Sequence, residues 1–203
     1  MSTSWLEQEY KRRDPAGLCE HSLTIRFEND RKQVPRVVQR LVGAAEQFGW
    51  MNPQACLYIG VALEEALLNA LIHGNLEVSS ALREADDDAF ERLIALRQAD
   101  ARYNERLVTV EMLGSREQMS WRVHDEGPGF NVSRLPDPRS TDRIGLQSGR
   151  GVLMMRSFMD EVAYNARGNE VTLVKRRKRT PSDVLDAIAE AIAEGPCGLA
   201  AVS

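Results

Sequence analysis

The sequence predicts an α+β fold, one mixed sheet covered by helices, and three observations lead to this prediction. Apolar and polar residues alternate at 21–27 and again over 107–124, which is the period of half-buried strands. Apolar residues recur every three or four positions over 34–48 and 53–72, which is the period of helices with one buried face. The resulting order is strand, helix, helix, insert, two strands, loop, helix and two strands, and it favours helices packed on a single sheet.

The composition limits what kind of protein this is. Its 203 residues are close to the length of one domain, and 43% hydrophobic with 28% charged residues is typical of a globular chain. A net charge of -4 gives no electrostatic reason to expect nucleic acid as the main partner. Cys19, Cys56 and Cys197 are odd in number and widely spaced, which argues against a disulfide framework and a zinc cluster. No signal peptide and no apolar run of about 18 residues is apparent, so we expect a cytoplasmic protein without a membrane partner.

The N-terminal part is expected to contain an extension, a strand and a helix. Residues 1–20 are polar and charged, and we interpret them as an extension. After the strand at 21–27, Asn29 or Asp30 can cap the first helix, which Gly49 ends.

A second helix begins at Asn52 and Pro53, a cap followed by a proline at the first helical position, and continues to about Ile72. Residues 76–106 differ in character, because they are dense in charge yet keep enough apolar residues for one or two amphipathic helices. We interpret them as a charged helical insert.

The second half of the chain returns to strands. Residues 107–124 contain two alternating runs, which indicate an antiparallel pair. Residues 131–148 are rich in Pro, Asp, Ser and Arg and are expected to form a long loop. A loop of that length in a compact domain is usually functional or mobile.

The C-terminal part is expected to hold two helices and two strands. A helix opens at 149–151, and strands follow at 161–166 and 170–176. The remaining segment, 178–203, contains a helix at 180–194 that starts with a capping pattern. This last helix could mediate a homodimer or cover a sheet edge, and we favour the second.

One polar stripe interrupts the second helix. Glu65, Asn69 and His73 are each four residues apart, so they lie on one face of an otherwise apolar helix. A carboxylate one turn from a carboxamide offers two oxygen ligands, which suits magnesium and its ordered waters. The same spacing is common on solvated surface helices, so the stripe alone leaves both interpretations open.

A second polar segment follows the strand pair and contains Asp125, Gly127 and Gly129. An aspartate can accept a hydrogen bond from an exocyclic amine, and glycines let the backbone approach a flat ligand closely. A tight turn has the same composition, so this segment is also ambiguous by itself.

The third segment, Gly149, Arg150 and Gly151, stands at the start of a helix. Exposed N–H groups at a helix N-terminus can bind phosphate, and Arg150 could add positive charge. Plain helix capping is the alternative. The segment is not a Walker A loop, since no Gly-Lys-Ser/Thr follows.

The order of these segments is more specific than any one of them. The chain contains, in order, Glu-x-x-x-Asn-Ala-x-x-His-Gly-Asn, Asp-x-Gly-x-Gly-Phe, and Gly-Arg-Gly before a helix. This series resembles the three conserved motifs of the gyrase, histidine-kinase and MutL ATPase superfamily. The sequence of residues 148–162 and 168–173 is similar to that of the anti-sigma-factor serine/threonine kinases of bacteria. The resemblance covers residues 21–177 apart from the insert. It implies a two-layer α/β sandwich of the histidine-kinase-like (Bergerat) type that binds ATP and Mg²⁺.

The resemblance also implies roles at the phosphate end of such a site. Asn69 would ligate the magnesium ion, and Glu65 would be the general base, directly or through water. Gly149, Arg150 and Gly151 would cradle the phosphates.

At the adenine end, the resemblance implies that Asp125 bonds the adenine amine, with Thr172 supporting the same pocket through water. Gly127 and Gly129 would let the adenine approach the backbone. His73 matches the family pattern and would support the site from behind.

The leading functional hypothesis is an ATP-dependent serine/threonine kinase. In the family that it resembles, the partners are a sigma factor, which is sequestered, and an anti-sigma antagonist, which is phosphorylated. The alternative from another class is a binding switch that holds a partner only with ATP bound. Glu65 favours the kinase, because a pure binder needs no base there.

Two other functions are disfavoured. A detached histidine-kinase catalytic domain would need a phospho-acceptor on a dimerisation helix, and His21, His73 and His124 do not lie on one. The basic run at 175–179 has no aromatic residues for stacking and is interpreted as a solvated strand edge rather than a nucleic-acid surface. The insert at 76–106 carries none of the motifs, so we expect it to serve partner contact or packing.

Overall fold

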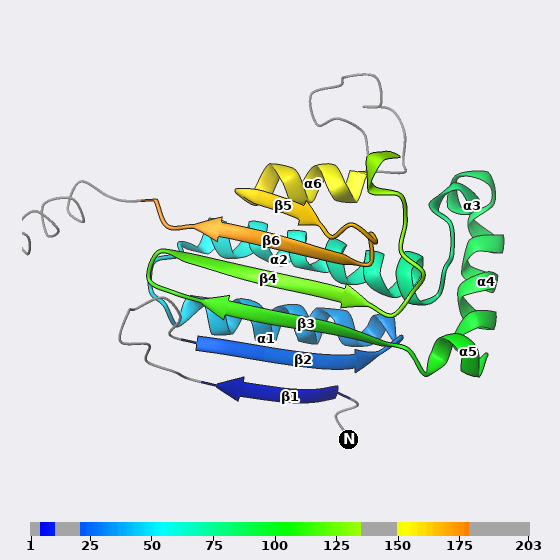
Figure 1. Ribbon diagram of the computed structural model, residues 1–203, viewed down its shortest axis with the longest axis horizontal. Coiled ribbons are helices and arrows are strands. Elements are labelled where there is room, and N and C mark those ends of the chain that lie inside the picture. Colours follow the sequence, from blue (N-terminus) through cyan, green and yellow to red (C-terminus); the bar gives the residue numbers. More distant parts are fainter. Residues whose placement is uncertain (1–4, 11–20, 135–149, 179–203) are drawn as a thin grey trace, which may run out of the picture.

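The structure is a computed structural model that describes residues 5–10, 21–134 and 150–178. Its strands form one sheet in the order β1-β2-β3-β4-β6-β5, and the long helices pack on one face of it (Figure 1). The strands are β1 (Trp5–Tyr10), β2 (His21–Glu28), β3 (Leu107–Gly114), β4 (Gln118–Asp125), β5 (Glu161–Tyr164) and β6 (Glu170–Arg176). The predicted α+β fold with two layers is confirmed. The predicted helix at 180–194, Gly149 and most of the predicted loop at 131–148 lie outside the described residues.

The sheet is antiparallel in all five described strand pairs, whereas a mixed sheet was predicted. The helices between β2 and β3 return the chain to the end that it left, so that Glu28 pairs with Leu107. The connection from β4 to β5, which contains α6, makes these two strands parallel, but β6 lies between them. No parallel pair is therefore in contact within this sheet, as far as it is described.

Part of the predicted N-terminal extension belongs to the sheet. The edge strand β1 pairs with β2 along its whole length, from Trp5 opposite Phe27 onwards. Its acidic residues contact the first helix, where the Arg40 guanidinium lies 2.7 Å from a Glu7 carboxylate oxygen and 3.0 Å from one of Glu9. Arg40 is more than 30 residues from these two glutamates along the chain. The polar composition of residues 5–10 therefore gave no indication of a strand.

The helix layer begins after a single 3-10 turn, Arg31–Gln33, which Asp30 caps by accepting from the Lys32 N–H at 2.9 Å. The first two helices are α1 (Val34–Glu46) and α2 (Pro53–Leu68). The predicted cap of α2 is confirmed, because the Asn52 side chain accepts from the Ala55 N–H at 2.8 Å. Beyond Leu68, α2 continues without a break as the π-helix η2 (Asn69–Asn75).

The continuous helix Pro53–Asn75 is long and rich in apolar residues. Its 23 residues contain an 18-residue window with a mean hydropathy of 1.6, so the helix is long and apolar enough to cross a membrane by length and composition alone. The expectation that no apolar run reaches this length was therefore wrong. Half of its most apolar window is buried inside the protein, and Ile59, Leu63 and Leu67 are fully buried in the core.

The core lies between the sheet and the helices. Alternate residues of the strands enter it, as Leu23, Ile25 and Phe27 do in β2, and Trp121 of β4 is the largest fully buried side chain. The opposite face of the sheet is polar. The remaining helix of the layer, α6 (Arg150–Phe158), packs on α2.

The insert forms a group of helices at one end of the sheet (Figure 1). They are α3 (Ser80–Ala85), α4 (Asp87–Gln98) and α5 (Ala101–Asn104), one more than the sequence predicted. Phe90 and Ile94 of α4 are buried in the main core. The insert is therefore part of the packed domain.

Candidate functional site

A cavity of about 300 Å³ opens between the C-terminal end of α2, the end of β4, the start of β6 and the start of α6. Five of the residues singled out in the sequence line it, namely Asn69, His73, Asp125, Gly129 and Gly151. The three motif segments, which are up to about 80 residues apart in the chain, therefore meet at one cavity.

The Asn69–Asn75 part of the first motif is presented by the π-helix η2, whereas Glu65 belongs to α2. The wider turn is visible in the hydrogen bond from the Leu76 N–H to the Leu71 carbonyl oxygen, five residues earlier, at 2.9 Å. π-Helical turns are rare and are often found at functional sites. Here the wide turn brings Asn69, His73 and Gly74 to the cavity wall.

Glu65 lies one turn before Asn69, at the place where α2 meets α6. It is half-buried, and this burial, together with the neighbouring charge of Glu64, raises the pKa of its carboxyl group. Gly151 of α6 packs directly against it, because a methyl group at that position would collide with the Glu65 carboxylate and lie 3.5 Å from the Asn69 amide nitrogen. The polar end groups of α2 and the N-terminus of α6 thus meet at one point.

Asp125, the last residue of β4, also lines the cavity. Its side chain is buried, and the Gly127 N–H donates to its Oδ1 at 2.9 Å. Burial raises the pKa of the Asp125 carboxyl to about 6, and the bond from Gly127 opposes that change. A buried carboxylate facing a cavity with a raised pKa is a mark of a ligand site, since the fold gains nothing from ionising it.

Two glycines are required by the close packing around Asp125. A methyl group at Gly74 would lie only 2.5 Å from both carboxylate oxygens of Asp125, and one at Gly127 would collide with the Gly74 carbonyl oxygen. The π-helix, the Asp125 side chain and the turn after β4 are therefore in direct contact. Gly129, whose φ of 77° is one that L residues rarely adopt, lies against the Arg167 carbonyl oxygen.

Two aromatic side chains complete the cavity wall: Phe130, the last residue of the second motif, and Tyr164, which lies outside the motifs. Phe130 and Tyr164 meet edge to face with ring centroids 5.3 Å apart, and both line the cavity. Burial raises the pKa of Tyr164 to about 12, so its hydroxyl is neutral at physiological pH. Flat apolar walls of this kind suit a planar heterocycle.

The turn between β5 and β6 is hydrogen-bonded to the backbone of Asp125. The Asn169 amide nitrogen donates to the Asp125 carbonyl oxygen at 2.9 Å, and the Asp125 N–H donates to the Asn169 carbonyl oxygen at 3.0 Å. Asn169 is itself buried and bonded by the Asn165 amide at 2.9 Å. Sequence reasoning quoted Asn169 in a motif but gave it no role.

Four predicted residues in the described part of the chain do not line the cavity. Two of them lie beside it, because Glu65 contacts Gly151 and the Gly127 N–H bonds Asp125. Thr172 is not among the cavity-lining residues, because the alternation of β6 turns Val171 toward the cavity and places Thr172 opposite Arg122 on the other face. Arg150 is exposed at the first position of α6, and Gly149 lies outside the described residues.

The donor set at the phosphate end fits a magnesium ion of the kind that nucleotides carry. Such an ion keeps several waters and takes one or two protein oxygens, the rest coming from phosphate. Glu65 and Asn69 offer one carboxylate and one amide within a single helical turn. No group of three acidic, histidine or cysteine ligands occurs in the described part of the chain, so an all-protein metal cage is not seen there.

The comparison with protein families agrees with this geometry. Residues 27–175, well over half of the chain, match the histidine kinase-like ATPase domain. The comparison with curated proteins gives no match. The matched range contains Glu65, Asn69, the turn after Asp125 and the start of α6. The chain belongs to the histidine kinase-like ATPase family.

Proposed function

We propose that the protein is an ATP-dependent serine/threonine kinase of the anti-sigma-factor type. The observation that carries the proposal is the placement of Glu65. This carboxylate, with a raised pKa, lies one turn from Asn69 and against Gly151 of α6, and both of these neighbours line the cavity. A site that only holds ATP needs no proton acceptor at its phosphate end.

At the adenine end, the Asp125 carboxylate would accept a hydrogen bond from the exocyclic amine. Gly74, Gly127 and Gly129 would allow the close backbone packing that keeps Asp125 at the cavity, and Phe130 with Tyr164 would cover the ring. A guanine base presents a carbonyl oxygen where adenine presents its amine, so the carboxylate would repel it. This arrangement supports selectivity for ATP over GTP.

At the phosphate end, Gly149, Arg150 and Gly151 would bind the phosphates through the N-terminal N–H groups of α6. Asn69 would hold Mg²⁺ through its amide oxygen. The bound ion would neutralise phosphate charge during transfer. His73 would support the site from behind, since its Nδ1 donates to the Val78 carbonyl oxygen at 2.5 Å and fixes the ring beside the cavity.

Glu65 would act as the general base. The oxygen of a serine or threonine hydroxyl forms the new bond to the γ-phosphorus, and the bond from that phosphorus to the β–γ bridging oxygen breaks. The hydroxyl proton passes to Glu65, directly or through one water, and ADP leaves. A carboxylate whose pKa is raised toward neutrality is a better proton acceptor in such a step.

The substrate would be an anti-sigma antagonist protein, and a sigma factor would be the sequestered partner. The likeness of residues 148–162 and 168–173 to that kinase group supports these partners. A cytoplasmic protein without direct contact to nucleic acid is consistent with this role. Thr172, which faces away from the cavity, has no place in the proposed chemistry.

Incubation of the protein with labelled Mg-ATP and candidate antagonists encoded nearby tests the proposal. We expect phosphate on a serine or threonine of one antagonist, identified by peptide mapping. Tight ATP binding without transfer to any of them would contradict the kinase. Partner binding that then required ATP would establish the non-catalytic switch instead.

A further inference from the structure

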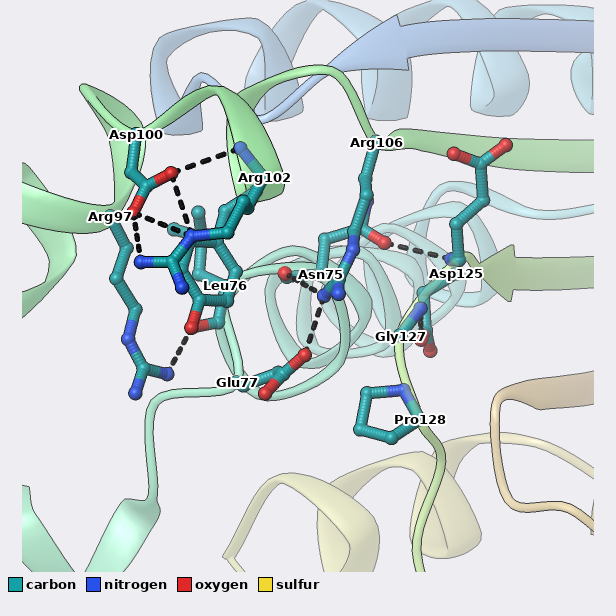
Figure 2. A network of polar contacts seen from close by, with 12 residues as sticks. Asn75, Leu76, Glu77, Arg97, Asp100, Arg102, Arg106, Asp125, Gly127 and Pro128 are labelled. Atoms are coloured by element: carbon teal, nitrogen blue, oxygen red, sulfur yellow. Dashed lines mark hydrogen bonds and ion pairs between the residues drawn. The ribbon is translucent and has the colours of Figure 1, made fainter.

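The insert is bonded to the rear of the adenine end of the ATP site (Figure 2). Asn75 is the last residue of the π-helix and is fully buried. Its side chain accepts from the Glu126 N–H at 2.8 Å, directly beside Asp125, and donates to the Asn29 side-chain oxygen at 2.9 Å. The Asn29 amide in turn donates to the carbonyl oxygens of Tyr103 at 2.7 Å and Arg106 at 3.0 Å.

The end of the π-helix leaves backbone carbonyls for which the helix provides no N–H. Two arginines of the insert bond to them, because the Arg106 guanidinium donates to the Asn75 carbonyl oxygen at 2.7 Å and that of Arg97 to the Leu76 carbonyl oxygen at 2.5 Å. Positive charge at the end of a helix is also favoured by the helix dipole. The insert therefore terminates the element that carries the first ATP motif.

Arg106 makes a second contact at this point. Its guanidinium also bonds the Glu77 carboxylate at 2.8 Å. Glu77 has a φ of 53°, and it is the one non-glycine residue with a positive φ in the described part of the chain. The chain thus leaves the π-helix through a backbone conformation at Glu77 that L residues rarely adopt. The ion pair with Arg106 fixes the Glu77 side chain at this position.

The position of Arg106 is itself fixed. Its guanidinium lies 5.2 Å from the centre of the Tyr103 ring, and those of Arg97 and Arg102 lie at 4.9 and 5.7 Å from the same ring. Arg102 bonds only Asp100 among its described side-chain partners and is largely exposed. Arg102 lies against the same Tyr103 ring as Arg106, but its described hydrogen bonds go to Asp100 and not to the π-helix.

We infer that Arg106 is a positioning residue for adenine binding, which acts through Asn75 and the π-helix on Asp125. The inference rests on the ATP-binding part of the proposed function and is independent of phosphotransfer. The contacts between Gly74 and the Asp125 carboxylate leave no free space, so a shift at the end of the π-helix displaces that carboxylate. The insert, which was expected to serve partner contact or packing, also sets the geometry of the nucleotide site.

The test compares Arg106→Gln with Arg102→Gln, the matched control on the same ring. We expect Arg106→Gln to weaken ATP, ADP and adenosine by the same factor, roughly tenfold, since about 1.4 kcal/mol corresponds to tenfold. The ratio of ATP to GTP affinity should fall as well. Arg102→Gln should leave all these affinities within twofold of the parent.

A double-mutant cycle separates positioning from a general loss of structure. If Arg106 acts through Asp125, then Arg106→Lys, which keeps the charge, should weaken ATP less in an Asp125→Asn background than in the parent. Equal effects in both backgrounds, or a folded Arg106→Gln variant with parental adenosine affinity, would overturn the inference. Absence of ATP binding by the parent itself would instead contradict the proposed function.

Discussion

Replacement of Asp125 by Asn should stabilise the nucleotide-free protein while weakening ATP binding. The carboxyl is 7% exposed, and burial raises its pKa from 3.8 to about 6. Between these values the folded protein holds the proton and the unfolded chain does not, so the free energy of unfolding falls as pH rises. At neutral pH, the native state therefore contains an ionised group that it disfavours.

The magnitude follows from the two pKa values. At about 1.4 kcal/mol per pH unit, ionised Asp125 lowers the free energy of unfolding by about 3 kcal/mol at pH 7. At pH 5, where the folded carboxyl is mostly protonated, the loss is about half as large. Asn keeps an oxygen that can accept the Gly127 N–H, so the variant should gain up to these amounts.

Urea unfolding of the parent and of Asp125→Asn at pH 7 and pH 5 measures this gain. Asp88→Asn, which changes an exposed aspartate of α4, is the control and should show no comparable pH-dependent gain. Calorimetry should show a ten- to hundredfold loss of ATP affinity in Asp125→Asn, on the order of 1–3 kcal/mol for a mismatched buried group. ATP affinity of the parent should fall as pH drops below about 6, because the protonated carboxyl no longer accepts as an anion.

A variant that is less stable than the parent at pH 7 would refute this reasoning. So would an Asp125→Asn protein that binds ATP and GTP with parental affinities, since the carboxylate would then not contact the base.

Two further substitutions test the two ends of the site. Asn69→Ala should abolish the contribution of Mg²⁺ to ATP affinity, and calorimetry with and without Mg²⁺ measures it; unchanged Mg-ATP affinity would remove Asn69 from the metal. Gly74→Ala should remove measurable ATP binding, because its methyl group would lie 2.5 Å from the Asp125 carboxylate oxygens. Gly60→Ala is its control, since a methyl there meets Val38 and Val42 at 3.7 and 3.8 Å, so ATP binding should persist; equal affinity in both variants would contradict the packing described at Asp125.

The sequence predicted those parts of the fold that depend on local pattern. The strand at 21–27, the cap at Asn52 and the strand pair over 107–124 all follow from residues within one element. β1 could not be predicted in this way, because its glutamates are paired by Arg40 of a distant helix. The antiparallel character of the sheet depends on where β6 inserts, which no local pattern encodes.

The site was predicted in part for a similar reason. Asp125, Asn69 and Gly151 lie in ordered motifs and meet at the cavity. The π-helical turn gave no signal, since its residues fit an α-helical spacing equally well. The role of Arg106 could not be predicted, because it depends on carbonyl oxygens left free by that turn.

The role predicted for Thr172 came from the resemblance alone. The alternation of β6 within the sequence already separates residue 171 from residue 172, and the structure places Val171 at the cavity wall. Burial of alternate strand residues is therefore the more reliable guide at this position.

Single-turnover phosphotransfer by Glu65→Gln is the most direct test of the kinase proposal. Parent and variant are compared with the same antagonist at saturating Mg-ATP, with Glu64→Gln as control, because Glu64 is the exposed neighbour. We predict that Glu65→Gln binds ATP like the parent but transfers phosphate about a hundredfold more slowly, the usual scale for a general base. Glu64→Gln should remain within a few-fold of the parent. Equal and measurable transfer by the parent and by Glu65→Gln would contradict the central claim.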